Sequence, residues 1–375
     1  MKLRDLKTPA AIVDLDVVER NTAWMAERIA SLGCRLRPHV KTHKCAEIAR
    51  LQVRGHFGGI TVSTLAEARF LADHGFRDVT YAFPLPINRI EEAAKLSERL
   101  DALSVLLDHP ATLKQLEAYA SRTEMRFRVF LKVDCGYHRV GVDPNREESV
   151  SFAARLSRSP HVDFRGILTH AGQSYHCASR EEIARVAREE REVMVAFAER
   201  LRDSGIEVPE VSVGSTPTMA VTDNLDGVTE ARPGNYVFYD AFQASIGSCA
   251  LVDCAFSVLV TVVGHYPDRN KLVINGGSLA FSLDPGPRAR DAECGYGVFV
   301  TLDGRRALPE LRLVALSQEH GQVFGSERID FARYPIGSPL RIVPNHSCLA
   351  AALFDRYHVV RRDEVVDEWR PARGW

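Results

Sequence analysis

The sequence predicts an α/β protein in which a (β/α)8 barrel of the TIM type, over residues 10–240, is followed by a mainly antiparallel β domain. Two observations predict this architecture. From residue 10 to about residue 216, short β-rich runs alternate with segments of helical periodicity, as in parallel strands joined by crossover helices. After Asp240, strand-like runs follow one another without long helices. The β domain is expected to cover residues 241–375 and to take in residues 1–9.

Eight β-rich runs supply the strands that a closed barrel requires. They are Ala10–Asp16, Arg35–Val40, Gly58–Ser63, Asp78–Phe83, Ala102–Asp108, Phe127–Asp134, Asp163–His170 and Glu210–Gly214. Helical periodicity lies between them over Val17–Leu32, Leu65–His74, Asn88–Leu100 and Arg180–Ser204. A doubly wound open sheet is the competing fold. The barrel is favoured because several runs end in polar residues, as barrel strands do beside an active site.

The β domain is predicted from five later runs that lack intervening long helices. They are Ser257–Tyr266, Lys271–Asn275, Gly297–Leu302, Leu311–Ser317 and Leu340–Val343. Connections such as Asp284–Gly286 contain the Pro and Gly residues typical of tight turns. An antiparallel sheet follows from this pattern.

Composition excludes several kinds of partner. The 375 residues carry a formal net charge of -1, with 45% hydrophobic and 26% charged residues, which is typical of a globular protein with a small-molecule partner and no nucleic-acid surface. The opening residues lead into no apolar signal core, and no apolar run is long enough to cross a bilayer. Eight scattered cysteines suit reduced thiols. We therefore expect a cytoplasmic protein without membrane contact.

Lys41 lies in the segment Pro38–Lys44, directly after the second predicted strand. It is therefore expected at the carboxyl end of that strand, where barrel enzymes carry their active sites. A solvated rim lysine is the ordinary interpretation of such a position. The alternative is a nucleophilic lysine that forms a Schiff base, as lysines do when they tether pyridoxal phosphate.

Two segments near the end of the barrel have the composition of an anion site. Val211–Thr218 closes the eighth predicted strand with Gly214, Ser215 and Thr216, and barrels commonly bind phosphate in the loops after their last strands. Further on, Arg232 precedes a turn that contains Gly234 and Asn235. Taken alone, both segments are also compatible with ordinary turns.

Two further segments place polar groups after the sixth and seventh predicted strands. Asp134–Arg139 ends in Arg139, and His170–Tyr175 begins with His170 and ends in Tyr175. Each segment by itself is more often structural than catalytic.

The pair His346 and Cys348 follows a β-rich run near the end of the chain. A His-x-Cys pair can present an imidazole and a thiolate to one metal ion. Two ligands are too few for a structural zinc site, which usually has four, but they suit a catalytic site whose shell water or substrate completes. A thiolate ligand favours Zn²⁺ over Mg²⁺ or Ca²⁺.

Taken together, these segments resemble the fold-type III pyridoxal-phosphate enzymes of the alanine racemase N-terminal-domain superfamily, and within it the D-serine dehydratase and D-threonine aldolase family. The resemblance covers nearly the whole chain. It is most specific at Pro38–Lys44, Val62–Ala68, Pro233–Asp240 and Pro344–Cys348.

The resemblance implies a role for each candidate residue. Lys41 would hold pyridoxal 5'-phosphate and act as the base at Cα. The phosphate would lie at Gly214, Ser215, Thr216, Gly234 and Asn235, with His170 and Tyr175 lining the same site. Arg139 would approach the cofactor's phenolic oxygen.

Arg232 would approach the pyridine nitrogen and keep it unprotonated, since a guanidinium cannot accept a hydrogen bond. The sequence departs in two ways from some dehydratases that it resembles. Another residue type precedes the Pro-Gly in those proteins, and Leu168 stands where some relatives carry a tyrosine that reaches the ring nitrogen. His346 and Cys348 would bind a divalent metal, with Zn²⁺ expected and Mn²⁺ or Mg²⁺ as alternatives.

The activity implied is that of an ammonia-lyase, a dehydratase that converts a D-β-hydroxy amino acid such as D-serine or D-threo-3-hydroxyaspartate to an oxo acid and ammonia. The first alternative is retro-aldol cleavage to glycine and an aldehyde, as in D-threonine aldolase. A non-catalytic pyridoxal-phosphate carrier is disfavoured, since a carrier needs neither the β domain nor the His-x-Cys pair. A metal-free racemase is disfavoured by the lack of a second-base signature. A homodimer is expected from the resemblance.

Overall fold

A computed structural model describes residues 1–288 and 290–375 and divides them into two compact units. The barrel unit consists of Met25–Gly234 and Ala372–Trp375, and the β unit consists of Met1–Trp24 and Asn235–Pro371. The boundaries therefore fall at residues 24, 234 and 371, whereas the sequence suggested residues 10 and 240. The chain crosses from one unit to the other three times.

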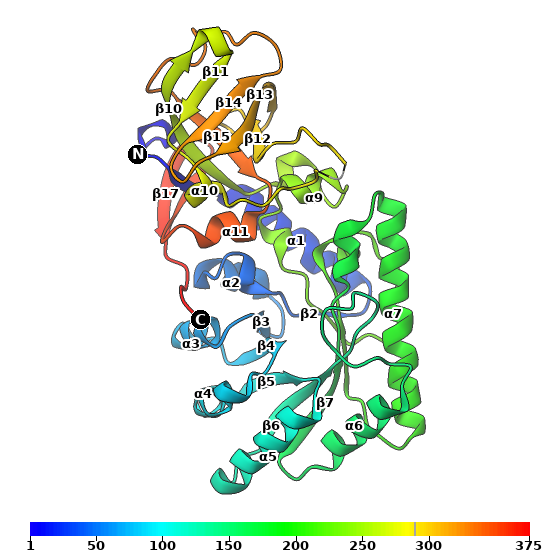
Figure 1. Cartoon of the computed structure of the whole chain (residues 1–375). Helices are drawn as coiled ribbons and strands as arrows, with labels where there is room; N and C mark the ends of the chain where they lie inside the picture. Colours follow the sequence, from blue (N-terminus) through cyan, green and yellow to red (C-terminus); the bar gives the residue numbers. More distant parts are fainter. Residues whose placement is uncertain (289) are drawn as a thin grey trace. The chain divides into compact units, whose positions relative to one another are not determined.

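The barrel unit is built on eight parallel strands (Figure 1). They are β2 (Arg35–Leu36), β3 (Ile60–Val62), β4 (Asp78–Pro84), β5 (Ala102–Leu107), β6 (Phe127–Lys132), β7 (Val162–Leu168), β8 (Glu210–Val213) and β9 (Glu230–Ala231). Their order is β2-β9-β8-β7-β6-β5-β4-β3. A parallel bridge between His39 and Thr61 joins the two ends of this order. The predicted TIM-like α/β architecture is confirmed.

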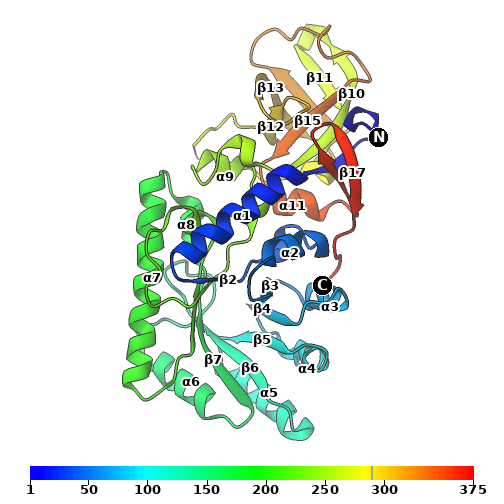
Figure 2. The same ribbon diagram turned by 180° about the vertical axis from the view of Figure 1, so that it is seen from behind.

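Helices follow most of these strands. They are α2 (Ala46–Val53), α3 (Leu65–Asp73), α4 (Ile90–Ser97), α5 (Pro110–Thr123), α6 (Glu147–Arg158), α7 (Arg180–Asp203) and α8 (Thr216–Val221). Figure 2 shows α4, α5 and α6 on the outer side of β5, β6 and β7. Local caps fix their starts, because the hydroxyl groups of Thr64 and Ser179 accept from the backbone N–H groups of Glu67 and Glu182.

The first predicted barrel strand belongs to the β unit. Strand β1 (Ala10–Asp14) pairs with β10 in antiparallel fashion and with β16 in parallel. The eighth barrel strand is instead β9, which has two residues. The sequence misled here because β1 is an apolar run that is buried on both faces, as a barrel strand would be.

The β unit contains a nine-stranded sheet with the order β11-β14-β13-β12-β15-β10-β1-β16-β17. In this order β1 lies between β10 and β16. An additional pairing of β11 with β10 closes six of these strands into a ring. The strands besides β1 are β10 (Phe256–Tyr266), β11 (Lys271–Ile274), β12 (Gly297–Val300), β13 (Ala307–Leu316), β14 (Gly321–Gly325), β15 (Pro339–Pro344), β16 (Tyr357–Arg361) and β17 (Glu364–Trp369). The five predicted runs correspond to β10, β11, β12, β13 and β15.

Helices in the β unit are short. They are α9 (Ala241–Ser245), α10 (Ser278–Phe281) and α11 (Ser347–Ala352). The longer helix α1 (Leu15–Ser31) begins in this unit and ends in the barrel unit. Within the described residues, no helix has both the length and the apolar character that crossing a membrane requires.

Candidate active site

Lys41 lies in a single 3-10 turn, η2 (Val40–Thr42), just after β2. The turn is anchored by His39, whose backbone N–H donates to the Pro233 carbonyl at 2.9 Å and whose Nδ1 accepts from the Lys41 backbone N–H at 3.4 Å. The side chain of Lys41 is exposed. By contrast, the Lys44 ammonium is 3.0 Å from the buried carboxylate of Glu67. Of the two lysines after β2, Lys41 is therefore the accessible one.

Lys41 shares its electrostatic environment with His39 and His170. Burial lowers the pKa of both His39 and His170 well below its usual value, and the charge of Lys41 lowers each further. The two imidazoles are therefore neutral near pH 7. Burial also lowers the pKa of Lys132 to about 7, assisted by the charge of Arg232. This part of the barrel unit is thus suited to an anionic ligand.

Arg139, His170 and Tyr175 gather around Tyr137. The Arg139 guanidinium lies 5.2 Å from the centre of the Tyr137 ring, and the Tyr137 and His170 rings are 6.4 Å apart. The ring of Tyr175 is in turn 6.4 Å from that of His170. Gly172 makes this packing possible, because a Cβ there would fall 2.2 Å from the Tyr137 ring. The loops after β6 and β7 therefore meet.

Gly214, Ser215 and Thr216 form the junction between β8 and α8. The hydroxyl of Ser215 caps α8 by accepting from the Thr218 N–H at 3.3 Å, and it lies 3.0 Å from the hydroxyl of Ser174. The Gly214 N–H is already bonded, at 3.0 Å, to the buried carboxylate of Glu190. The Gly214 amide is therefore already engaged within the protein.

Arg232 is buried in the barrel unit just beyond β9. Its Nε donates to the Ser212 hydroxyl at 2.6 Å, and its Nη2 donates to the Thr169 carbonyl. Gly234 follows, where a Cβ would fall 2.6 Å from the His39 carbonyl oxygen. The absence of a side chain at Gly234 therefore lets this segment approach the turn that carries Lys41.

The candidate metal ligands lie at the end of β15 in the β unit, where His346 precedes α11 and Cys348 lies within it. Nδ1 of His346 is 3.0 Å from Oδ2 of Asp284. Burial lowers the pKa of His346, but the Cys348 thiolate and the Asp284 carboxylate more than offset it and raise this pKa to about 11. These acidic neighbours therefore favour the protonated His346 imidazole.

A buried carboxylate fixes the turn that carries the two ligands. Asp240 accepts from the backbone N–H of Ser347 at 3.0 Å and from the side-chain amide of Asn235 at 2.9 Å. The same Asn235 amide is 3.5 Å from the Cys348 sulfur. Asn235 thus contributes to the candidate metal site through its side chain, whereas the sequence had suggested its backbone for the phosphate.

The donor set fits a borderline metal ion with an open coordination shell. Imidazole and thiolate are ligands that Zn²⁺ accepts, and the Asp284 contact orients the His346 ring, as carboxylates do for metal-bound histidines. Within residues 1–288 and 290–375, no group of three or more His, Cys, Asp or Glu side chains could hold a metal ion. A metal ion held by only two protein side chains would have room for water or substrate in its shell.

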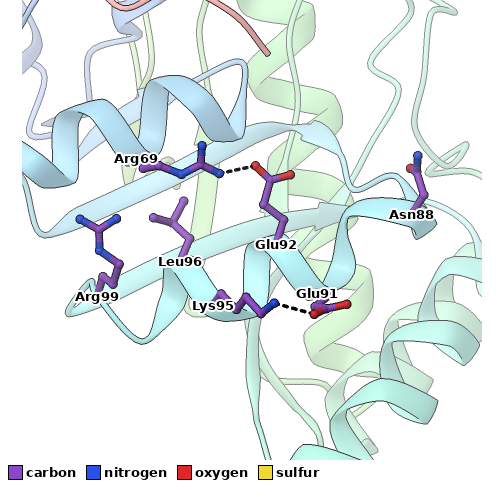
Figure 3. Close-up of a pocket in the computed structure, with 7 residues that line it drawn as sticks. All are labelled: Arg69, Asn88, Glu91, Glu92, Lys95, Leu96 and Arg99. Carbon is purple, nitrogen blue, oxygen red and sulfur yellow. Dashed lines mark hydrogen bonds and ion pairs between the residues drawn. The ribbon is translucent and has the colours of Figure 1, made fainter.

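The hollow shown in Figure 3 lies elsewhere, on the outside of the barrel unit. It is lined by α3, α4 and their flanking turns, and ion pairs join Arg69 to Glu92 at 2.7 Å and Lys95 to Glu91 at 2.6 Å. Such exposed pairs are typical of a solvated helix surface. None of the candidate residues lines it.

Several residues of the two sites were missed from the sequence. Lys132, Glu190 and Asp284 contact predicted site residues, or share their electrostatic environment, although they lie far from them in the chain. Glu230 accepts a hydrogen bond from Ser212, which also contacts Arg232. A weak indication of this position exists in the sequence, since Glu230 precedes Arg232 by two residues and residues two apart in a strand point to the same face. No comparable spacing signal marks Lys132, Glu190 or Asp284.

Comparison with known proteins links both units to one group. Residues 13–241 match the family model described as alanine racemase, N-terminal domain, and residues 255–360 match the one described as putative serine dehydratase domain. The chain is 38% identical to a D-serine dehydratase of Dictyostelium discoideum over 393 residues, which cover 100% of this chain and 98% of the relative. It is 39% identical to the D-threo-3-hydroxyaspartate dehydratase of Delftia sp. (strain HT23) over 377 residues, covering 100% and 99%.

Solved structures of that second protein have the same fold. Its histidine-to-alanine variant superposes with a TM-score of 0.96 at 38% identity, covering 100% of this chain and 97% of that chain. A cysteine-to-alanine variant, in the metal-free form, gives 0.94 at 38% identity and covers 100% of both. A D-threonine aldolase from Arthrobacter sp. is 31% identical over 387 residues, covering 100% of this chain and 94% of the relative.

Proposed function

We propose a function from one premise, that the chain belongs to the family of proteins with an alanine racemase N-terminal domain. The proposed function is that of a pyridoxal-phosphate- and metal-dependent dehydratase of D-β-hydroxy amino acids. The enzyme class is that of a lyase: it converts a substrate such as D-serine or D-threo-3-hydroxyaspartate to an oxo acid and ammonia. The full-length similarity to two dehydratases, at 38% and 39% identity, is the observation that carries this conclusion.

Lys41 is proposed to hold the cofactor and to move the substrate's α-proton. Pyridoxal phosphate, when bound, supplies the electron sink that makes the Cα–H bond acidic. Lys41 suits both tasks because its side chain is accessible and the nearby His39 and His170 are neutral. Arg139 and Arg232 are proposed to face the phenolic oxygen and the ring nitrogen of the cofactor. Tyr175 lines the same region.

The phosphate is proposed to bind at Ser215, Thr216 and the backbone of Gly214, Gly234 and Asn235. The hydroxyl groups at the start of α8 are neutral donors, and Arg139 lies in the same unit. Because Glu190 occupies the Gly214 N–H, the hydroxyl groups are expected to carry more of this contact.

His346 and Cys348 are proposed to bind a divalent metal ion, with Zn²⁺ favoured by the thiolate. A bound metal ion supplies a Lewis acid for the β-hydroxyl, which is otherwise a poor leaving group. Asp284 orients His346, and Asp240 holds the intervening turn. The cysteine-to-alanine variant of D-threo-3-hydroxyaspartate dehydratase, whose structure is that of a metal-free form, supports a metal in this family.

Retro-aldol cleavage is the second candidate activity, because a D-threonine aldolase is 31% identical to this chain. The identity of the products distinguishes the two activities. Purified protein is given D-serine, D-threonine and D-threo-3-hydroxyaspartate in turn, and ammonia, oxo acid, glycine and aldehyde are measured. Ammonia and oxo acid in equal amounts are expected. Glycine and aldehyde without ammonia would show an aldolase, and no turnover of any of the three would contradict both activities.

The cellular setting is proposed on simpler grounds. All eight cysteines are thiols and none is part of a disulfide, which suits a reducing compartment such as the cytoplasm. A homodimer is proposed from the resemblance to fold-type III enzymes, and light scattering of the purified protein measures it.

A further inference from the structure

A continuous chain of hydrogen bonds runs from Arg232 through the interior of the barrel unit. The Ser212 hydroxyl, which accepts from Nε of Arg232 at 2.6 Å, donates to Oε1 of Glu230 at 2.7 Å. The other oxygen of Glu230 accepts from Nε of Arg37 at 2.7 Å. Arg37 then binds both carboxylate oxygens of Asp78, at 2.7 and 3.1 Å. The chain thus connects β9, β8, β2 and β4.

The direction of these bonds is fixed by chemistry. An arginine Nε can only donate, so the Ser212 oxygen must be the acceptor toward Arg232. A serine hydroxyl has a single hydrogen, and this hydrogen is therefore left for Glu230. Glu230 accepts at both of its oxygens, from Ser212 at one and from Arg37 at the other. Glu230 therefore sets the orientation of the Ser212 hydroxyl. That hydroxyl in turn helps to position the Arg232 guanidinium.

The residues of this hydrogen-bond chain that lie next to Arg232 are buried, so the loss of one bond is costly. Glu230 and Ser212 are 0% exposed and Arg232 is 4% exposed, so no solvent can replace a missing partner and an unpaired buried group is costly. Burial lowers the pKa of Arg232 to about 10, while the Glu230 and Glu190 carboxylates oppose that shift. Glu230 thus helps to keep Arg232 charged as well as oriented.

The bonds of Arg232 also leave one edge of its guanidinium available. Within the described residues, the donors of its hydrogen bonds are Nε and Nη2. Nη1 therefore takes no part in the chain of hydrogen bonds. We propose that Glu230 is a positioning residue: acting through Ser212, it holds Arg232 in the orientation in which Nη1 meets the pyridine nitrogen of the cofactor. This inference rests on the proposed function.

The test uses the cofactor-loaded enzyme and the variants Ser212→Ala and Glu230→Gln, alone and combined. Loss of one buried bond to a charged group should lower kcat for D-serine by about tenfold or more, with a smaller change in KM. The absorption spectrum of the bound cofactor, and its pH dependence, should change as well, because the group facing the ring nitrogen has moved. A purely structural role would alter thermal stability without altering the spectrum.

The β unit offers a matched control. Nε of Arg341 donates to the Ser257 hydroxyl at 2.7 Å, and both residues are buried, so Ser257→Ala removes the same kind of bond away from Arg232. It should leave the cofactor spectrum unchanged. Ser212→Thr, which keeps the hydroxyl, should recover most of the activity that Ser212→Ala loses. If Glu230→Gln does not fold, the Ser212 variants decide alone.

The combined variant tests whether the two residues act in one chain. Residues that act in series give a double variant no worse than the more impaired single variant, whereas independent residues give multiplied losses. Multiplied losses, or a Ser212→Ala spectrum identical to that of Ser257→Ala, overturn the proposal. Failure of the proposed function is recognised separately, because a protein that binds no cofactor at Lys41 gives no spectrum to compare.

Discussion

Lys41 differs from the other lysines near the candidate cofactor site in accessibility. Lys44 is paired with Glu67 at 3.0 Å, and Lys132 is 5% exposed with its ammonium nitrogen 3.3 Å from the Val133 carbonyl. Reduction of the holoenzyme with borohydride should therefore attach the pyridoxyl group to Lys41. Peptide mapping by mass spectrometry measures the position, with unreduced protein as the control. A label on Lys44 or Lys132 would refute the assignment.

The buried position of Lys132 predicts how the stability of the protein depends on pH. Its pKa falls from 10.5 to about 7 on burial, so between about pH 7 and 10.5 the unfolded chain binds this proton more strongly than the folded protein does. Stability therefore rises with pH across that window, and the penalty is fully present below pH 7. Lys132→Met should stabilise the cofactor-free protein below pH 7, by at most about 5 kcal/mol, and this gain should shrink toward pH 10.

Urea denaturation of both proteins at pH 6 and pH 9 measures the difference. Lys95→Met is the control, because Lys95 lies on the exposed face of α4 in a pair with Glu91 and should change stability little at either pH. A stability difference for Lys132→Met that is the same at both pH values would contradict the prediction.

At the scale of single elements, the junction between β8 and α8 combines a cap with a candidate phosphate site. Replacing Ser215 and Thr216 together by alanine should weaken cofactor binding by about a hundredfold or more, since each lost bond to a charged group is worth roughly 1.5–3 kcal/mol. Equilibrium titration of the apoenzyme with pyridoxal phosphate measures this. Ser179→Ala removes the comparable cap of α7 and should leave the affinity unchanged. Equal affinity of all three proteins would exclude the hydroxyl groups from the site.

Element lengths explain where sequence-based prediction succeeded. Long, largely apolar runs such as β5, β6 and β7 were recognised, and their positions were predicted to within a few residues. Strand β9 has two residues, too few for any periodicity, so the eighth strand was placed elsewhere. β1 was assigned to the wrong sheet because an apolar run does not reveal its partners. Strands β14, β16 and β17 were not predicted.

Site residues follow the same rule. Those that lie within recognisable motifs, such as Lys41, His346 and Cys348, could be proposed from the sequence and remain proposals. Ser212, Glu190 and Asp284 acquire their roles only through contacts between distant segments. Tertiary hydrogen bonds of this kind leave no spacing in the sequence.

At the scale of the whole molecule, the two units are proposed to divide the chemistry, with the cofactor in the barrel unit and the metal ion in the β unit. Removal of the metal by chelation should therefore abolish turnover of D-serine while the protein stays folded and keeps its cofactor. Circular dichroism and the cofactor's absorption measure the last two properties. Unfolding on chelation would show that the metal has a structural role.

A substrate that needs no Lewis acid sharpens this test. Chloride leaves β-chloro-D-alanine unaided, so the metal-free enzyme should still process that compound. His346→Ala and Cys348→Ala should behave like the chelated enzyme, and Cys249→Ala, at another half-buried cysteine of the β unit, should behave like the unaltered protein. Equal loss of both activities in the His346 and Cys348 variants, with the cofactor still bound, would mean that the metal does not act on the leaving group.

The pairing of β1 has a consequence for biosynthesis. Its neighbours in the sheet are β10 and β16, which leave the ribosome only after the complete barrel segment Met25–Gly234 has been made. At roughly 5–20 residues per second, the apolar strand Ala10–Asp14 waits about ten seconds or more with both edges unpaired. An unpaired apolar edge is a site of aggregation. The nascent chain is therefore expected to need chaperone protection at this strand until β10 and β16 have been made.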